Sequence, residues 1–342
     1  MVSLRQLRCF VAVYEERSFT AASVREGATQ SGMSQHVRQL EDELGVPLFE
    51  RIGREIAPTP TGHRYYHECV SVLRHLDRAT REASASGLDC PGQVRIGLMP
   101  SFTRAALAPV LARFTELASR TDVFVTEAYS GVLTDMVRAD ALDFAVVPAF
   151  RGATGLTISR LMRDREMLVA SAAGPIGGHL KPVRPAELGP LKMVVPGQGN
   201  TRRTTIESYL LTNEANVAKR IELDAMIGTL EFVAASDWVT ILPSVILAPD
   251  RLGERYTIRP LADPDLHSDF VVIEPARRVM SEPAQLFADL LRKETGRIAD
   301  LWREALGDAD LRIVARERAP ALALGARPER SITPADAADR GF

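Results

Sequence analysis

Residues 31–51 of this 342-residue chain read SGMSQHVRQLEDELGVPLFER. Apolar side chains recur there at the spacing of one helix face, at Met33, Val37, Leu40 and Leu44. The opposite face carries short polar groups and one arginine, at Ser31, Ser34, Gln35 and Arg38. A helix face that meets only water commonly carries Glu and Lys instead. This stretch therefore predicts a helix whose polar face has a binding role.

The flanking residues predict two more helices ahead of this one. Residues 4–15 place apolar side chains at helical spacing. Ser18 or Thr20 can cap a short second helix. Ser31 can cap the third, which we expect to end before Gly45. The predicted order is helix, helix, turn, helix.

A hairpin and a long helix are expected next. Residues 47–58 show short extended pieces around an Ile-Gly-Arg turn. Thr59 followed by Pro60 is a helix-start signal, and we expect a helix to about residue 85. Such a helix outside a core often pairs with a copy of itself. Residues 84–92, SASGLDCPG, indicate a linker.

From residue 93 the pattern changes to strands that alternate with amphipathic helices. This alternation predicts parallel α/β units. A last helix is expected at about 283–306. The remaining residues, 307–342, are rich in Ala, Arg, Asp and Pro without a sustained period, which predicts a flexible tail.

Composition narrows the function classes. The formal net charge is −2, and residues 1–89 hold eleven Arg, no Lys and twelve Asp plus Glu, so 11 − 12 = −1. Bulk charge therefore does not predict nucleic-acid binding. No apolar run spans a membrane and no secretory signal begins the chain, which favours the cytoplasm. Three unpaired cysteines fit a reducing compartment.

The helical order still favours DNA. Three helices and a hairpin are typical of a winged helix-turn-helix, whose second motif helix places polar side chains in the major groove. Amide, hydroxyl and guanidinium groups match the donors and acceptors of base edges. We therefore expect base contacts from Gln30, Ser31, Ser34 and Gln35, and phosphate or minor-groove contacts from Arg38, Arg51 and Arg54. The competing interpretation is a solvated helix on a small helical lobe.

A resemblance strengthens the DNA-binding hypothesis. Residues 4–62 resemble the amino-terminal domain of LysR-type transcriptional regulators, through LRQLRCFVAVYEERSFTAA, TQSGMSQHVRQLEDELGVPLFER and TPTGHRYY. Thr29 and Gln30 stand where the family has Ser-Gln, whereas Ser31 replaces the usual Pro. Glu26 replaces a usual Leu. The resemblance implies binding of Thr29 and its neighbours to double-stranded DNA, self-association as a dimer or tetramer, and contact with RNA polymerase.

The resemblance continues into the second part of the chain, through GQVRIGLMPSFTRAALAPVLARF and LDFAVVP. It implies an α/β chain with a winged helix-turn-helix domain (1–59), a linker helix (60–88) and a periplasmic-binding-protein-like effector domain (92–306). Its two lobes are expected at about 92–163 with 267–306, and at about 164–266. A ligand would lie between them.

Helix starts at the carboxyl ends of parallel strands suit a small anion, because free N–H groups and the dipole favour negative charge. One arginine of the stretch PGQGNTRRTT could clamp a carboxylate. The expected effector contacts are Ser101, Phe102, Thr103, Ser130, Pro148, Asn200, Thr201, Arg202, Arg203 and Thr229. Ser and Thr before helices are also ordinary caps, so the alternative for several of them is purely structural.

Two other function classes compete. An enzyme would need a catalytic arrangement, and the six scattered histidines form no triad, HExxH or similar motif. A small-molecule-binding protein without a DNA role fits the α/β part alone, but not the fused amino-terminal domain. We expect no enzyme activity, no cofactor and no metal.

Overall fold

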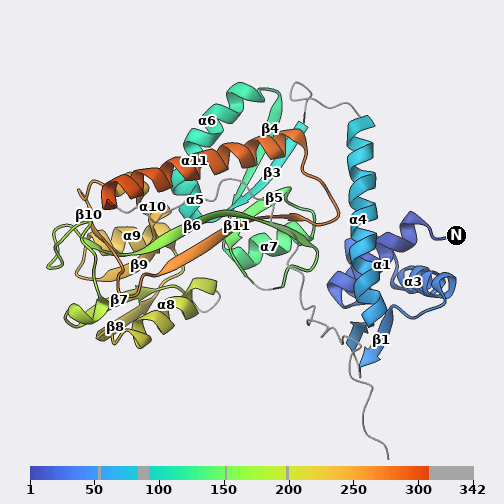
Figure 1. The fold of residues 1–342 in the computed structure, drawn as a ribbon, viewed down its shortest axis with the longest axis horizontal. Coiled ribbons are helices and arrows are strands. Elements are labelled where there is room, and N and C mark those ends of the chain that lie inside the picture. The colour runs from blue at the N-terminus through green and yellow to red at the C-terminus, as the bar shows by residue number, and fades with distance from the viewer. Residues whose placement is uncertain (53–54, 84–91, 151, 198–199, 308–342) are drawn as a thin grey trace, which may run out of the picture.

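The structure, a computed structural model, describes residues 1–52, 55–83, 92–150, 152–197 and 200–307. The amino-terminal helices and α4 form one body, and a larger α/β body lies beside them (Figure 1). None of the helices in these ranges is long and apolar enough to cross a membrane. The predicted tail beyond residue 307, the end of the linker and Arg54 lie outside the described residues.

The first body begins with the three predicted helices: α1 Leu4–Glu16, α2 Phe19–Arg25 and α3 Gln30–Leu44. Ser18 caps α2, as one of the two predicted candidates, and Gly45 ends α3 with a φ of +70°. The predicted cap of α3 was wrong. Thr29 is the cap, with its hydroxyl accepting from the Gly32 amide, and Ser31 lies inside the first turn.

The predicted hairpin and long helix follow: β1 Phe49–Ile52, β2 Glu55–Pro58 and α4 Pro60–Ala83. The Thr59 hydroxyl accepts from the Gly62 amide and so caps α4. A Cβ at Gly62 would lie 2.2 Å from the Leu48 carbonyl oxygen. This close approach explains why α4 starts with Thr-x-x-Gly, since any side chain at Gly62 would push α4 away from the segment between α3 and β1.

The larger body is built on a nine-stranded sheet with the path β4-β3-β5-β11-β6-β9-β7-β8, and β10 pairs with β6. Its strands are β3 Gly92–Leu98, β4 Thr121–Glu127, β5 Phe144–Pro148, β6 Leu156–Ser171, β7 Leu191–Val195, β8 Val217–Glu222, β9 Val239–Pro243, β10 Tyr256–Pro260 and β11 His267–Pro275. The outer pairs, such as β3 with β4 and β7 with β8, are parallel as predicted.

The middle of the sheet is not parallel. Both long strands, β6 and β11, run antiparallel to each other, and each pairs antiparallel with a strand of one outer group. Strand β6 exchanges partners at its centre: residues up to Arg165 face β11, and residues from Glu166 face β9. The alternation of strands with helices predicted only parallel units, because antiparallel returns within an α/β body carry no helix to mark them.

Helices cover both faces of this sheet: α5 Pro100–Phe102, the π-helical turn η1 Thr103–Leu107, α6 Ala108–Leu117, α7 Ser130–Arg138, α8 Thr201–Thr212, α9 Met226–Ala234, α10 Ser244–Leu247 and α11 Glu282–Leu306, with short 3₁₀ turns η2 Pro185–Glu187 and η3 Ala248–Asp250. Phe102, Phe270 and Phe287 are fully buried in the main core between the sheet and α11. The helical stretch from α5 to α6 begins at Pro100, and Ser101 lies in its first turn.

Candidate functional site

The first candidate site is the polar face of α3. Met33, Val37 and Leu40 are buried against α1 and α2, so the opposite face is turned outward. Four side chains on it are exposed and Ser34 is half-buried; the exposed ones are Gln30, Ser31, Gln35 and Arg38. Among the described residues, Gln30, Gln35 and Arg38 form no side-chain hydrogen bond or ion pair. Their donors and acceptors are therefore available to a partner.

Two neighbouring elements extend this face. Thr29 is exposed, but its hydroxyl is used to cap α3 and lies 3.3 Å from the Ser31 hydroxyl. Arg51 is exposed on β1, at the edge of the hairpin. The described members of the predicted DNA-contacting set are thus all at the surface, with Ser34 half-buried.

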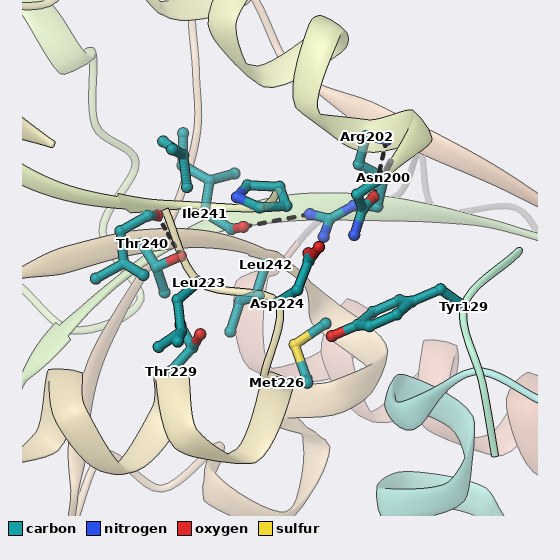
Figure 2. A pocket seen from close by; sticks show the side chains of 13 residues that line it. Tyr129, Asn200, Arg202, Leu223, Asp224, Met226, Thr229, Thr240, Ile241 and Leu242 are labelled. Atoms are coloured by element: carbon teal, nitrogen blue, oxygen red, sulfur yellow. Dashed lines mark hydrogen bonds between the residues drawn. The ribbon is translucent and has the colours of Figure 1, made fainter. Parts of the chain in front are cut away.

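The second candidate site is a cavity at the carboxyl ends of β7 and β9. Its volume is about 20 Å³, and Tyr129 closes it from the opposite lobe (Figure 2). Three residues of the predicted effector set line it, namely Asn200, Arg202 and Thr229. The remaining lining residues are Val194, Val195, Pro196, Leu223, Asp224, Met226, Thr240, Ile241 and Leu242.

Arg202 is the only buried cation in this lining. Its guanidinium bonds Glu166 through Nε, at 3.1 Å, and through Nη2, which also donates to the Ile241 carbonyl at 3.2 Å. Both partners are almost fully buried, at 5 % and 1 % exposure. Nη1 makes no hydrogen bond to the described residues. Asn200 caps α8 by accepting from the Arg202 amide, and so fixes where α8 begins.

Arg203 points away from the cavity. Its guanidinium pairs with Glu207 one turn along α8 and with Glu222 on β8, at 3.1 and 2.6 Å. Of the two predicted clamps, the structure therefore selects Arg202. The Thr201 side chain lies outside the described part of the chain.

The other predicted effector residues do not line the cavity. Phe102 packs edge-to-face on Phe270 in the core, and Pro148 is buried at the end of β5. The Thr103 hydroxyl bonds Glu127. Ser130 is buried at the start of α7, where its carbonyl accepts from Thr134. Position at a helix start does not by itself place a side chain in this cavity, because such a residue can face the core as well as a cleft.

Ser101 stands apart from this group. It is 1 % exposed, and its hydroxyl has no hydrogen-bond partner among the described residues. A buried hydroxyl without a partner costs about 1–3 kcal/mol, so such an atom marks a place where a water or a ligand group fits.

Asp224 is a lining residue that sequence reasoning missed. Its Oδ1 accepts from the Gly197 amide at 2.9 Å, and its side chain is exposed at the cavity mouth. Burial raises the pKa of the Tyr129 hydroxyl nearby, and the negative charge of Asp224 raises it further. The sequence signal that could have identified Asp224 is its position at the acidic end of the stretch RIELD, two residues after β8. The lining thus combines a paired cation with an unpaired carboxylate.

Comparisons with known proteins match both parts of the chain. Residues 4–63 match the family model described as a bacterial regulatory helix-turn-helix protein of the lysR family, and residues 91–296 match the LysR substrate binding domain. This chain belongs to the LysR family. It is a LysR-type transcriptional regulator with an effector-binding domain, and its relatives are regulators rather than enzymes.

Several relatives carry names that refer to peroxide. A probable hydrogen peroxide-inducible genes activator of Streptomyces viridosporus is 29 % identical over 91 % of this chain and 97 % of its own length. A protein of the same name from Mycobacterium xenopi is 31 % identical over 52 % of this chain and 93 % of its own. Full-length OxyR of Pseudomonas aeruginosa, a cysteine variant, has a TM-score of 0.55 at 20 % identity, covering 85 % of this chain and 95 % of that one; this likeness shows the fold.

Proposed function

We propose that this regulator reads promoter DNA with the polar face of α3 and responds to a small organic anion that binds between the lobes of its effector domain. The observation that carries the first half is the exposed and unpaired set of side chains on α3. Gln30, Ser31, Ser34 and Gln35 would contact base edges, because amides and hydroxyls match them. Arg38, Arg51 and Arg54 would contact phosphates.

The effector half rests on two residues that line the cavity and on one buried hydroxyl outside its lining. Nη1 of Arg202 is left for an acid group, the Ser101 hydroxyl lacks a partner, and Asp224 offers an acceptor at the mouth. The carboxylate of an effector would pair with Arg202, and a hydroxy or amino group on the same molecule would donate to Asp224. About 20 Å³ holds about one water, so such a molecule requires the lobes to move apart.

A peroxide response is the second candidate, because relatives are named for it. The cysteines of this chain are Cys9, Cys69 and Cys90, so residues 91–342 contain no thiol. Oxidation of a cysteine within the effector domain is therefore not available as a signal. Cys9 and Cys69 are buried in the first body, where burial raises the pKa of each thiol and so disfavours the reactive thiolate.

We further propose that the chain works as a dimer or tetramer in the cytoplasm and contacts RNA polymerase. The two edge strands of the sheet, β4 and β8, support self-association: both are open, with Phe124, Val217 and Ile221 exposed. On α4, Val72 is an exposed apolar residue on a helix expected to pair with its copy.

A thermal-shift screen of the purified protein against carboxylates, hydroxy acids, amino acids and hydrogen peroxide tests the effector. A ligand at a hundred times its dissociation constant stabilises the folded state by about 2.7 kcal/mol. We expect a hit among the acids that is lost in Ser101→Ala, with Ser236→Ala as the matched control. A blank across the acids with intact DNA binding would overturn the anion proposal, and a peroxide response would overturn the argument from the missing thiols.

A further inference from the structure

The DNA-binding body is docked on the effector domain of its own chain through buried charges. Arg277, two residues after β11, pairs with Asp140 after α7 and reaches Glu15 and Glu26 of the first body, each at 3.7 Å. Glu26 is the residue at which this sequence departs from the family's usual Leu. Arg277 explains why this position carries Glu rather than Leu, because the side chain faces that arginine of the effector domain.

Tyr66 of α4 makes a second, more specific link. Its hydroxyl donates to Glu15 at 2.8 Å and accepts from the Gly155 amide, just before β6, at 2.9 Å. Its ring stacks on Tyr14 at 3.9 Å between centroids. Gly155 has a φ of +78°, and a Cβ there would lie 3.0 Å from the Glu15 carboxyl carbon. The two domains are thus in direct contact at this point.

Further along α4, two more side chains bond residues at the start of β6 and at or just after the end of β11. Arg74 donates to the Thr157 hydroxyl at 2.6 Å and pairs with Glu274 at 3.2 Å. Asp77 accepts from the Val279 amide at 3.0 Å. In Figure 1 the connection between β11 and α11 comes close to α4 at this level. The start of β6 and the end of β11 therefore form the effector side of the junction.

The start of β11 and the point at which β6 changes partners lie next to Arg202, which lines the cavity. Strands β6 and β11 pair from Leu156 with Pro275 to Arg165 with His267, about 30 Å of antiparallel ribbon. The register shifts once, between Phe270 and Val271, where Leu161 of β6 is left without a partner on β11. At the Arg165 end, the Ser268 hydroxyl of β11 donates to Glu166 of β6 at 2.5 Å. Glu166 is the carboxylate that holds Arg202.

We propose that this β6–β11 ribbon couples the effector cavity to the orientation of the DNA-binding domain. The proposal rests on the effector cavity of the preceding section. An acid group that takes Arg202 from Glu166 changes the contacts at one end of the ribbon, and the junction at Glu15, Tyr66 and Arg277 responds at the other. A hydrogen-bonded strand pair suits this role because it runs from beside Arg202 to the junction with no loop in between.

The junction is built to have two states rather than a continuous range. Burial raises the pKa of the Glu15 carboxyl, although Arg25 and Tyr66 both favour its charged form. Arg277 adds one more cation to these carboxylates, of which Glu15 also has Arg25 and Tyr66 as partners and Asp140 also has Arg278. A docked and a released arrangement are therefore separated by the loss of several contacts together, and a shift of the ribbon can favour either one.

Hydrogen exchange of the full-length protein tests the coupling without any effector. The cavity end is changed by Ser268→Ala, with Ser236→Ala as control. The Ser236 hydroxyl donates to the Phe232 carbonyl and accepts from the Trp238 amide, both within its own lobe. The junction end is changed by Tyr66→Phe, with Tyr65→Phe as control, since Tyr65 packs on Phe10 inside the DNA-binding body.

We expect Tyr66→Phe to accelerate exchange in peptides covering residues 153–157, because the Gly155 amide loses its acceptor. Ser268→Ala should accelerate exchange there and over residues 276–280 by about two- to thirty-fold, the range of typical coupling effects. Both controls should leave these peptides unchanged. An effect of Ser268→Ala confined to residues 164–170 would overturn the coupling, and an unchanged junction in Tyr66→Phe would overturn the docking. Neither result depends on whether the effector proposal holds.

Discussion

The polar face of α3 and the cavity beside Arg202 use polar side chains in opposite ways. On α3, Gln30, Gln35 and Arg38 are exposed, and none has an internal partner among the described residues. In the cavity, Arg202 is buried and bonded to Glu166. We expect a partner to bind a surface of the first kind without disturbing the fold. At the cavity, a ligand would share Arg202 with Glu166, so we expect binding there to be linked to conformation.

The largest effect should follow loss of the buried pair. Arg202→Ala leaves Glu166 buried without its cation, and we expect a loss of about 3–5 kcal/mol of unfolding free energy. Arg203→Ala, one residue along, is the matched control at about 0–1 kcal/mol, because its partners are largely exposed. Urea unfolding measures both. Equal losses in the two variants would remove the distinction between a buried and a surface pair.

The second prediction is a pH effect at Asp164, close to the point where β6 changes its pairing from β11 to β9. Asp164 is fully buried, and burial raises its pKa to about 7, although Ser244 and Val245 donate to it. The native state then holds a proton that the unfolded state releases, so stability falls as pH rises from about 4 to 7, by up to about 1.4 kcal/mol per pH unit. Asp164→Asn cannot titrate and should flatten this slope. A slope unchanged in the variant would contradict the assignment.

On the DNA side, effects should fall on affinity alone. Gln35→Ala is expected to lose about 1–3 kcal/mol of binding to the cognate site, as for a base-reading amide. Gln39→Ala, one turn further from the start of α3, serves as control. Fluorescence anisotropy with specific and scrambled DNA separates the two. A loss that is equal on both DNAs would make Gln35 a phosphate contact instead.

A smaller effect is expected for the cap of α3. Thr29→Ala removes the hydroxyl that accepts from the Gly32 amide and should cost about 1 kcal/mol of stability. Ser31→Ala should cost less, because Ser31 is not the cap. The reverse order in thermal unfolding would restore the sequence-based assignment.

The smallest change in stability belongs to Arg38. Arg38→Ala should alter the unfolding free energy by less than about 0.5 kcal/mol, because the side chain is exposed. Its contribution should show in DNA binding, where loss of one phosphate contact lowers the salt slope by about one. An unchanged salt slope would exclude the phosphate role.

Much of the first body was predictable because its signals are local. The apolar spacing of α3, the cap at Ser18 and the Thr59-Pro60 start of α4 each lie within a few residues of the element that they specify. The misplaced cap at Ser31 was also a local error, of two residues. The cavity was predicted less well, because Arg202 and Arg203 are equivalent in sequence and differ only in what the fold places opposite them.

By itself the sequence determined the winged helix-turn-helix, the alternation of strands and helices, and the polar face of α3, since periodicity and caps act over one or two turns. Only the tertiary structure decided that Arg202 meets Glu166, 36 residues away, and that Glu26 meets Arg277 across the domain junction. These pairings depend on the antiparallel course of β6 and β11. Chain segments distant in sequence become neighbours there, and no local pattern records which side chains then face each other.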